Sequence, residues 1–180
     1  MKIKPFKIEG LYHIEADAKI DSRGMFARIY CKNEFEHHYL NTKWVQINIS
    51  VNSIAGTLRG LHFQTGNSAE VKLVRCIHGQ AIDIALDLRE NSETYGEHVM
   101  VELDSERLNS IYIPPGFAHG FQTMSDKTVL QYFHSEFYEP KKEGGVNALD
   151  PDISINWPLP VNKLSDRDAN LPPLKKVLPL

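Results

Sequence analysis

The chain has 180 residues, of which 42% are hydrophobic and 24% charged, and its formal net charge is −3. These values predict one folded domain with its own core, and they exclude a disordered chain and the strong basic charge that nucleic acids or anionic membrane surfaces attract. No apolar run approaches the ~20 residues of a membrane helix or the pattern of a signal peptide, and Cys31 and Cys76 have no CxxC partners. We therefore expect one domain over residues 1–180, located in the cytoplasm, with no nucleic-acid or membrane partner.

The first forty residues carry short β patterns and one helix pattern. Residues 10–15 are typical of an edge strand, and the turn at residues 21–24 leads into a predicted strand over residues 25–30. Asn33 is a competent N-cap for a helix over residues 33–40.

Strand patterns dominate from residue 44 to residue 138. Residues 44–52 and 81–88 alternate between apolar and polar side chains, and further β-rich runs cover residues 71–77, 98–103, 110–113 and 128–138. Turn residues recur about every ten positions, which favours a β-sandwich or barrel over βαβ units. Gln46, Asn48 and Asp83 are polar on the side that a closed sheet turns inward, so the pattern predicts a barrel with a polar cavity.

The last forty residues differ from the rest. Residues 139–180 contain seven of the ten prolines and show little periodicity, which predicts a tail that wraps the surface with short helical turns. Ser165 could open one such turn, with Asp168 three residues later as in a capping box.

Near the middle of the chain, Arg59 and His62 flank a glycine that allows close backbone approach. The pair is either a satisfied polar pair inside a sheet or part of a reactive site. Taken alone, the stretch from Arg59 to Gln64 favours the first alternative.

Several kinds of chemistry are disfavoured. Residues 114–119 have the P-x-G-x-x-H spacing of cupin barrels and would turn His119 inward, but the earlier strand offers Gln64 where a metal-binding cupin has a second histidine, with Lys72 nearby. We therefore expect no metal. G-x-S-x-G, P-loop and G-x-G-x-x-G motifs are absent, and Cys76 lies in a strand pattern typical of a buried cysteine.

Acid–base chemistry without a cofactor remains. On the strand predicted over residues 128–138, Tyr132 and Tyr138 have the same parity and would face one side. Each candidate also has an ordinary structural interpretation: an exposed strand lysine for Lys72, a core aromatic for Tyr132, a capping residue for Asp168 and a turn-holding role for Arg23. The residues alone indicate a β-barrel with a polar cavity and leave open whether it is an enzyme. The candidates are His62, Lys72, Tyr132, Tyr138, Asp83 and Asp168, with Arg23 and Arg59.

Several motifs in order resemble the dTDP-4-dehydrorhamnose 3,5-epimerase family over nearly the whole chain. The most specific are R-G-L-H-F-Q at residues 59–64 and G-F-A-H-G-F at residues 116–121. Others are D-S-R-G-M-F at 21–26, Q-I-N-I-S at 46–50, K-L-V-R at 72–75 and L-S-D-R-D at 164–168.

The resemblance implies an all-β, cupin-like jelly roll with short peripheral helices. It also implies a homodimer in which part of segment 1–40 reaches into the partner's sheet. The implied reaction inverts C3 and C5 of a nucleoside-diphosphate 4-keto-6-deoxyhexose without cofactor or metal. By this resemblance His62 is the base, Asp168 orients it, Lys72 stabilises the enolate and Tyr132 returns a proton on the opposite face.

The resemblance also implies a set of substrate-binding residues. Arg23 and Arg59 would bind the diphosphate, with Arg23 and Phe26 able to come from the neighbouring subunit. At position 28 this chain has arginine where glutamate is common in the family, near the nucleotide. The resemblance therefore leaves the identity of the nucleotide base open. An epimerase acting at C3 only, a non-catalytic sugar-nucleotide-binding cupin and a metal-dependent cupin are the alternatives. The remaining implied contacts are Gln46, Asn48, Glu143, His119, Phe26 and Tyr138.

Overall fold

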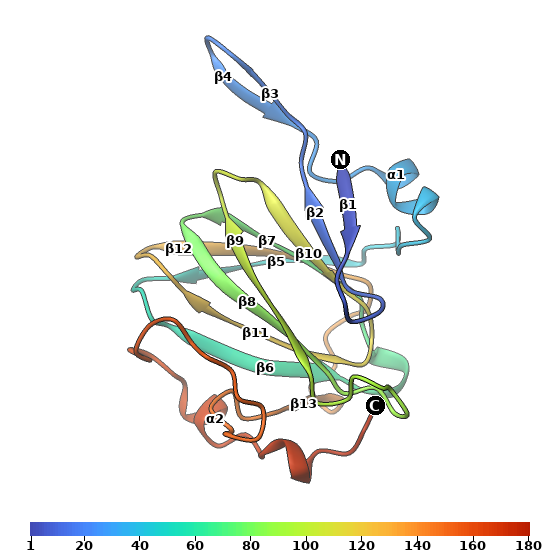
Figure 1. The fold of residues 1–180 in the computed structure, drawn as a ribbon, viewed down its shortest axis with the longest axis vertical. Helices are drawn as coiled ribbons and strands as arrows, with labels where there is room; N and C mark the ends of the chain where they lie inside the picture. Colours follow the sequence, from blue (N-terminus) through green and yellow to red (C-terminus); the bar gives the residue numbers. More distant parts are fainter.

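Two antiparallel sheets pack face to face in the computed structural model, which describes residues 1–180 (Figure 1). The larger sheet has the order β1 (Lys2–Pro5), β2 (Tyr12–Glu15), β10 (Asn109–Ile113), β7 (Lys72–His78), β12 (Thr128–His134) and β5 (Gln46–Asn52). The second has the order β13 (Glu143–Gly145), β6 (Leu58–Gln64), β11 (Phe117–Thr123), β8 (Gln80–Asp87) and β9 (His98–Asp104). The predicted all-β jelly roll is confirmed.

A separate hairpin, β3 (Ala18–Asp21) and β4 (Gly24–Ala27), projects away from the two sheets (Figure 1). The helices are short: α1 (Lys32–His37), α2 (Asp166–Ala169) and 3₁₀ turns at Gly66–Ser68 and Leu174–Lys176. No helix is both long and apolar enough to cross a membrane.

The space between the sheets is apolar at one end and polar at the other. The apolar end is filled by a cluster that includes Val74, Cys76, Phe117, Phe121 and Leu130. A second cluster, with Leu61, Leu86 and Val146, lies between the five-stranded sheet and the proline-rich tail. Burying each such side chain stabilises the fold by about 1.5–3 kcal/mol, so both sheets and the tail are held in place around the polar end.

Three predicted elements have different boundaries in the structure. The predicted strand over residues 25–30 ends at Ala27, and α1 begins at Lys32 with Cys31 at the N-cap position, so Asn33 lies inside the helix and is not its cap. The helix ends early because Tyr39 takes a left-handed conformation, with φ of 57°. The predicted strand over residues 128–138 ends at His134. At the next residue, the Ser135 side-chain hydroxyl accepts a hydrogen bond from the Val71 N–H.

Strand β5 lies at the edge of the six-stranded sheet and has two different faces. Gln46, Asn48 and Ser50 turn inward and line a cavity. Ile47, Ile49 and Val51 turn outward and are 56%, 61% and 60% exposed. The alternation follows the sequence pattern, but the apolar side is the uncovered one in the single chain.

Candidate active site

A cavity of about 370 Å³ opens at the polar end of the sandwich. That size suits a sugar or part of a nucleotide sugar. Strands β5, β6, β7, β11 and β12, helix α2 and the segment around Glu143 all contribute side chains to it. The predicted site residues that line it are Gln46, Asn48, Arg59, His62, Lys72, His119, Tyr132, Tyr138, Glu143 and Asp168.

Gly60 allows strands β6 and β11 to approach each other closely next to this site. Its φ is +108°, and a Cβ there would lie 2.7 Å from both the Gly120 Cα and the His119 carbonyl oxygen. Only glycine fits such a contact, so β6 and β11 come together beside His62.

His62 and Asp168 form a hydrogen-bonded pair on one side of the cavity. The His62 Nε2 lies 2.8 Å from Asp168 Oδ1, and Asp168 Oδ2 accepts the Gly60 N–H at 3.1 Å. The Ser165 hydroxyl accepts the Asp168 N–H at 3.0 Å, so the predicted capping role is real for Ser165, while the Asp168 carboxylate turns to the histidine. The cap thereby fixes where the carboxylate sits.

The protonation of His62 follows from its surroundings. Burial lowers the pKa of His62 below its usual 6.5, and the Asp168 carboxylate opposes that shift only in part. The imidazole is therefore mostly neutral at pH 7. Because Nε2 is engaged by Asp168, Nδ1 is the nitrogen free to accept a proton.

Lys72 is a cavity residue. It is 7% exposed, which rules out the exposed-lysine interpretation. Its Nζ donates to the His62 carbonyl oxygen at 3.3 Å and lies 3.2 Å from Glu70 Oε1. The ammonium is thus held next to the His62 backbone.

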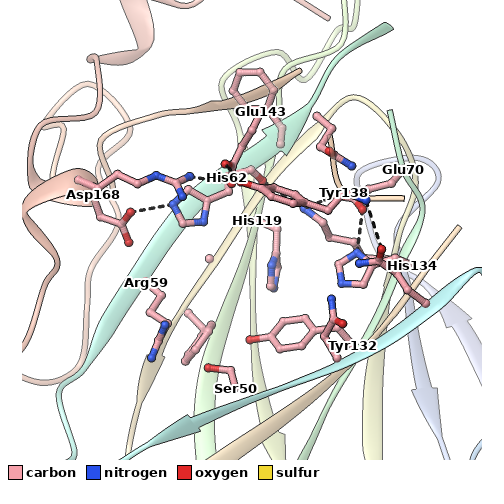
Figure 2. Close-up of a pocket in the computed structure, with 18 of the residues that line it drawn as sticks. Ser50, Arg59, His62, Glu70, His119, Tyr132, His134, Tyr138, Glu143 and Asp168 are labelled. Carbon is pink, nitrogen blue, oxygen red and sulfur yellow. Dashed lines mark hydrogen bonds and ion pairs between the residues drawn. The ribbon is translucent and has the colours of Figure 1, made fainter. Parts of the chain in front are cut away.

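Tyr132 enters the cavity from β12, between two histidine rings (Figure 2). The His119 ring meets it edge-on and the His134 ring stacks on it, each with centroids 6.0 Å apart. Burial raises the pKa of Tyr132 far above its usual value, and the nearby Asp83 carboxylate adds to the rise. The phenol therefore keeps its proton at neutral pH.

His119 forms a hydrogen bond with a buried aspartate. Its Nε2 lies 2.8 Å from Asp83 Oδ2, and Asp83 is fully buried on β8. Burial raises the pKa of Asp83, while His119 opposes the rise. The inward direction predicted for Asp83 is correct.

Cationic and aromatic groups surround the mouth of the cavity. Arg59 donates from Nε to Asn52 Oδ1 at 2.8 Å, which leaves the rest of its guanidinium fork free. The Tyr138 hydroxyl donates to Glu143 at 2.7 Å, and Arg167 pairs with the other Glu143 oxygen at 2.6 Å. Tyr138 lies beyond the end of β12, so the parity argument for it was wrong although it does line the cavity.

Arg23 and Phe26 do not reach this cavity within the chain. Both lie on the projecting hairpin, where Arg23 pairs with Asp21 of its own turn at 2.7 Å and Phe26 is 77% exposed. For Arg23, the single chain therefore matches the turn-holding interpretation.

Gln64 is occupied by the backbone. Its amide nitrogen donates to the carbonyls of Ser68 and Phe137, and its oxygen accepts the Glu139 N–H at 2.7 Å. These bonds tie three loops together and leave no free ligand at the second histidine position of metal-binding cupins.

Ser50, Glu70, His134 and Arg167 are polar cavity residues that the sequence did not single out. Ser50 continues the inward set of Gln46 and Asn48, and His134 follows Tyr132 by two positions, so strand parity could have found both. Glu70 and Arg167 lie outside the strands, and no periodic pattern marks them.

Comparison with known proteins gives consistent matches over nearly the full length. The family model described as dTDP-4-dehydrorhamnose 3,5-epimerase matches residues 5–176. The dTDP-4-dehydrorhamnose 3,5-epimerase of Methanothermobacter thermautotrophicus is 41% identical and covers 94% of this chain and 92% of its own. The crystal structure of the Elizabethkingia anophelis dTDP-4-dehydrorhamnose 3,5-epimerase is 43% identical with a TM-score of 0.92 and 97% coverage of each chain.

A structure solved with a bound sugar nucleotide is also similar to this chain. The dTDP-6-deoxy-D-glucose-3,5-epimerase of Legionella pneumophila, solved with dTDP-4-keto-L-rhamnose, is 35% identical with a TM-score of 0.92 and covers 98% of this chain and 94% of its own.

Proposed function

Because the chain belongs to the dTDP-4-dehydrorhamnose 3,5-epimerase family, we propose that it is an isomerase that inverts C3 and C5 of a nucleoside-diphosphate 4-keto-6-deoxyhexose. The observation that carries the proposal is that the His62–Asp168 pair, Lys72 and Tyr132 face one cavity. A base, a cation and a proton donor around one sugar-sized space are what inversion of a carbon acid requires. A purely binding cupin needs none of them.

His62 is the base of the proposed reaction. Hydrogens on the carbons beside the C4 ketone are acidic once the resulting enolate is stabilised. The free Nδ1 of the neutral imidazole takes the proton, and the Asp168 carboxylate stabilises the imidazolium that forms. No metal or redox cofactor takes part in this step.

Lys72 and Tyr132 complete the inversion. The Lys72 ammonium offsets the negative charge that develops on the enolate oxygen. Tyr132, which keeps its proton, delivers it to the opposite face of the same carbon. Solvent water then removes the proton from His62 and restores the one lost by Tyr132, and the cycle is repeated at the second carbon.

The substrate's diphosphate and base need other contacts. The free part of the Arg59 fork suits phosphate oxygens, and the Tyr138 ring offers a surface for the base. Gln46, Asn48, Glu143 and His119 supply polar groups between these two ends. Since the relatives are named for dTDP sugars, dTDP-4-dehydro-6-deoxyglucose is the first substrate to test.

We propose a homodimer in which the hairpin β3–β4 of one protomer delivers Arg23 and Phe26 to its partner's cavity. The hairpin exposes Ile20, Met25 and Phe26, side chains that water disfavours. The partner would offer the unpaired edge of β5 and its exposed Ile49. Adding strands to such an edge satisfies its free backbone groups.

The free thiols of Cys31 and Cys76 support our placement of the enzyme in the reducing cytoplasm.

Deuterium exchange tests the reaction. In D₂O the enzyme should incorporate deuterium at both C3 and C5 of the substrate, as measured by mass spectrometry and NMR. Exchange at one carbon only would reduce the proposed function to that of a C3 epimerase. No exchange with any 4-keto sugar nucleotide would refute the proposal that the protein is an epimerase. His62→Ala should abolish exchange while dTDP still binds.

Subunit mixing tests the shared site. Arg23→Ala and His62→Ala should each be nearly inactive alone, because one removes a phosphate contact given to the partner and the other removes the base. Mixed after reversible dissociation, they should regain about a quarter of wild-type activity, since half of the dimers are hybrids with one intact site. No recovery in a mixture shown to contain hybrids would contradict the exchange of the hairpin.

A further inference from the structure

An acid that the proposed reaction does not use bridges two cavity residues. The Glu70 side chain is 8% exposed; its Oε1 lies 3.2 Å from Lys72 Nζ and its Oε2 lies 2.7 Å from His134 Nδ1. Burial opposes ionisation of this carboxyl, but the His134 hydrogen bond and the Lys72 charge outweigh it, and the pKa of Glu70 lies below its usual value. Glu70 is therefore a charged link between Lys72 and His134.

His134 is held with one nitrogen committed and the other free. It stacks on Tyr132 with an interplanar angle of 23°, and its Nδ1 is engaged by Glu70. Its Nε2 makes no hydrogen bond within the chain, although the residue lines the cavity. A carboxylate at one imidazole nitrogen fixes the orientation of the ring and leaves the other nitrogen for a ligand.

The position of the pair within the cavity points to the sugar. Figure 2 shows Glu70 and His134 on the side of the pocket opposite Arg59 and Asp168. Glu70 pairs with Lys72, which the proposed reaction places at the enolate oxygen, and His134 stacks on Tyr132, which delivers the proton to the hexose, so the pair lies where the hexose binds.

We propose that His134 contacts a hydroxyl group of the hexose and helps to set which sugar the cavity accepts, and that Glu70 is a positioning residue that fixes both His134 and Lys72. The inference rests on the proposed function, because it takes the ligand to be a sugar nucleotide. A hydroxyl suits the free imidazole nitrogen, which accepts its proton when neutral and donates to its oxygen when charged.

The test compares ligands with and without the sugar. For His134→Ala we expect the KM for the 4-keto-6-deoxyhexose nucleotide to rise about 3- to 10-fold, the effect of one lost hydrogen bond. The Kd for dTDP, measured by calorimetry, should stay within about twofold, because dTDP lacks the hexose. His134→Gln, which keeps a polar group, should recover part of the loss.

Glu70→Gln tests the positioning role. This change preserves the shape of the side chain but removes the charge that holds Lys72. We therefore expect kcat to fall, and by more than any change in the kcat of His134→Ala, while the Kd for dTDP is unchanged. Glu102→Gln makes the same chemical change in an exposed pair with Arg107 at 3.3 Å and should leave both constants at wild-type values.

Three results would overturn the inference. The first is a wild-type KM in folded His134→Ala, and the second is an equal weakening of dTDP and sugar nucleotide in that variant. The third is a wild-type kcat in Glu70→Gln; should this variant fail to fold by circular dichroism, the two His134 variants decide. Turnover by the wild-type enzyme in the same assay keeps the proposed function separate from these outcomes, since only its absence would refute that function.

Discussion

Asp168 fixes both the orientation and the tautomer of His62, so Asp168→Asn tests the proposed base directly. In the native pair the carboxylate accepts from His62 Nε2–H at 2.8 Å, and Nδ1 keeps its lone pair. An asparagine oxygen can still accept the Gly60 N–H, which the carboxylate accepts at 3.1 Å. Its amide then donates to Nε2, which moves the proton to Nδ1 and removes the base.

The size of the effect follows from what is lost. We expect kcat to fall by about 10³–10⁴-fold, the range for a general base held in the wrong tautomer. Asp168 is 5% exposed, so water cannot readily replace the carboxylate. Arg59 and Tyr138 are untouched, so the Kd for dTDP should stay within about twofold.

The pH dependence of kcat/KM gives an independent test, because the direction of its shift can be predicted. Burial lowers the pKa of His62 and the Asp168 carboxylate raises it, so removing that charge lowers the pKa further. The acid limb of kcat/KM, where His62 gains a proton and stops acting as a base, should therefore move to lower pH.

Deuterium incorporation from D₂O, followed from about pH 5 to 9, measures both quantities. Asp166→Asn on the same helix is the matched control, because Asp166 is exposed and its carboxylate makes no hydrogen bond to the cavity. A folded Asp168→Asn enzyme within tenfold of wild-type kcat, or an acid limb that moves to higher pH, would refute the assignment of His62 as the base.

Three further predictions concern other parts of the molecule. Tyr132→Phe should keep exchange of substrate hydrogens but lose net inversion by about 10²-fold or more; NMR compares deuterium uptake with inverted product, and equal rates would contradict the donor role. Arg59→Lys keeps the charge but loses the fork, so the Kd for dTDP should rise about 10-fold by calorimetry, whereas an unchanged Kd would place the diphosphate elsewhere. For Asp87, burial opposes ionisation but hydrogen bonds from Arg89 and Thr94 hold its pKa at about 2. Its lowered pKa contributes about 2 kcal/mol above pH ~4 that is lost as the pH falls toward 2. Asp87→Asn should therefore lower the urea-unfolding free energy by that amount at pH 7 and much less at pH 2, and equal losses at both pH values would contradict this account.

The sequence by itself determined the β class and the faces of the strands, because strand periodicity is a local property of the chain. Gln46 and Asn48 turn inward as their parity requires, and Ser165 caps its helical turn as its spacing indicates. The pattern could not say whether the apolar side of β5 is covered, and in the single chain Ile49 is exposed.

Only the tertiary structure decided which polar groups meet. His62 and Asp168 are 106 positions apart, and Glu70 and His134 are 64 apart. Such contacts depend on how the two sheets close over each other and where the tail crosses, which no local period encodes. For the same reason the sequence could not place Arg23 relative to the cavity, and the folded chain carries it away from the cavity on the β3–β4 hairpin, where it pairs with Asp21.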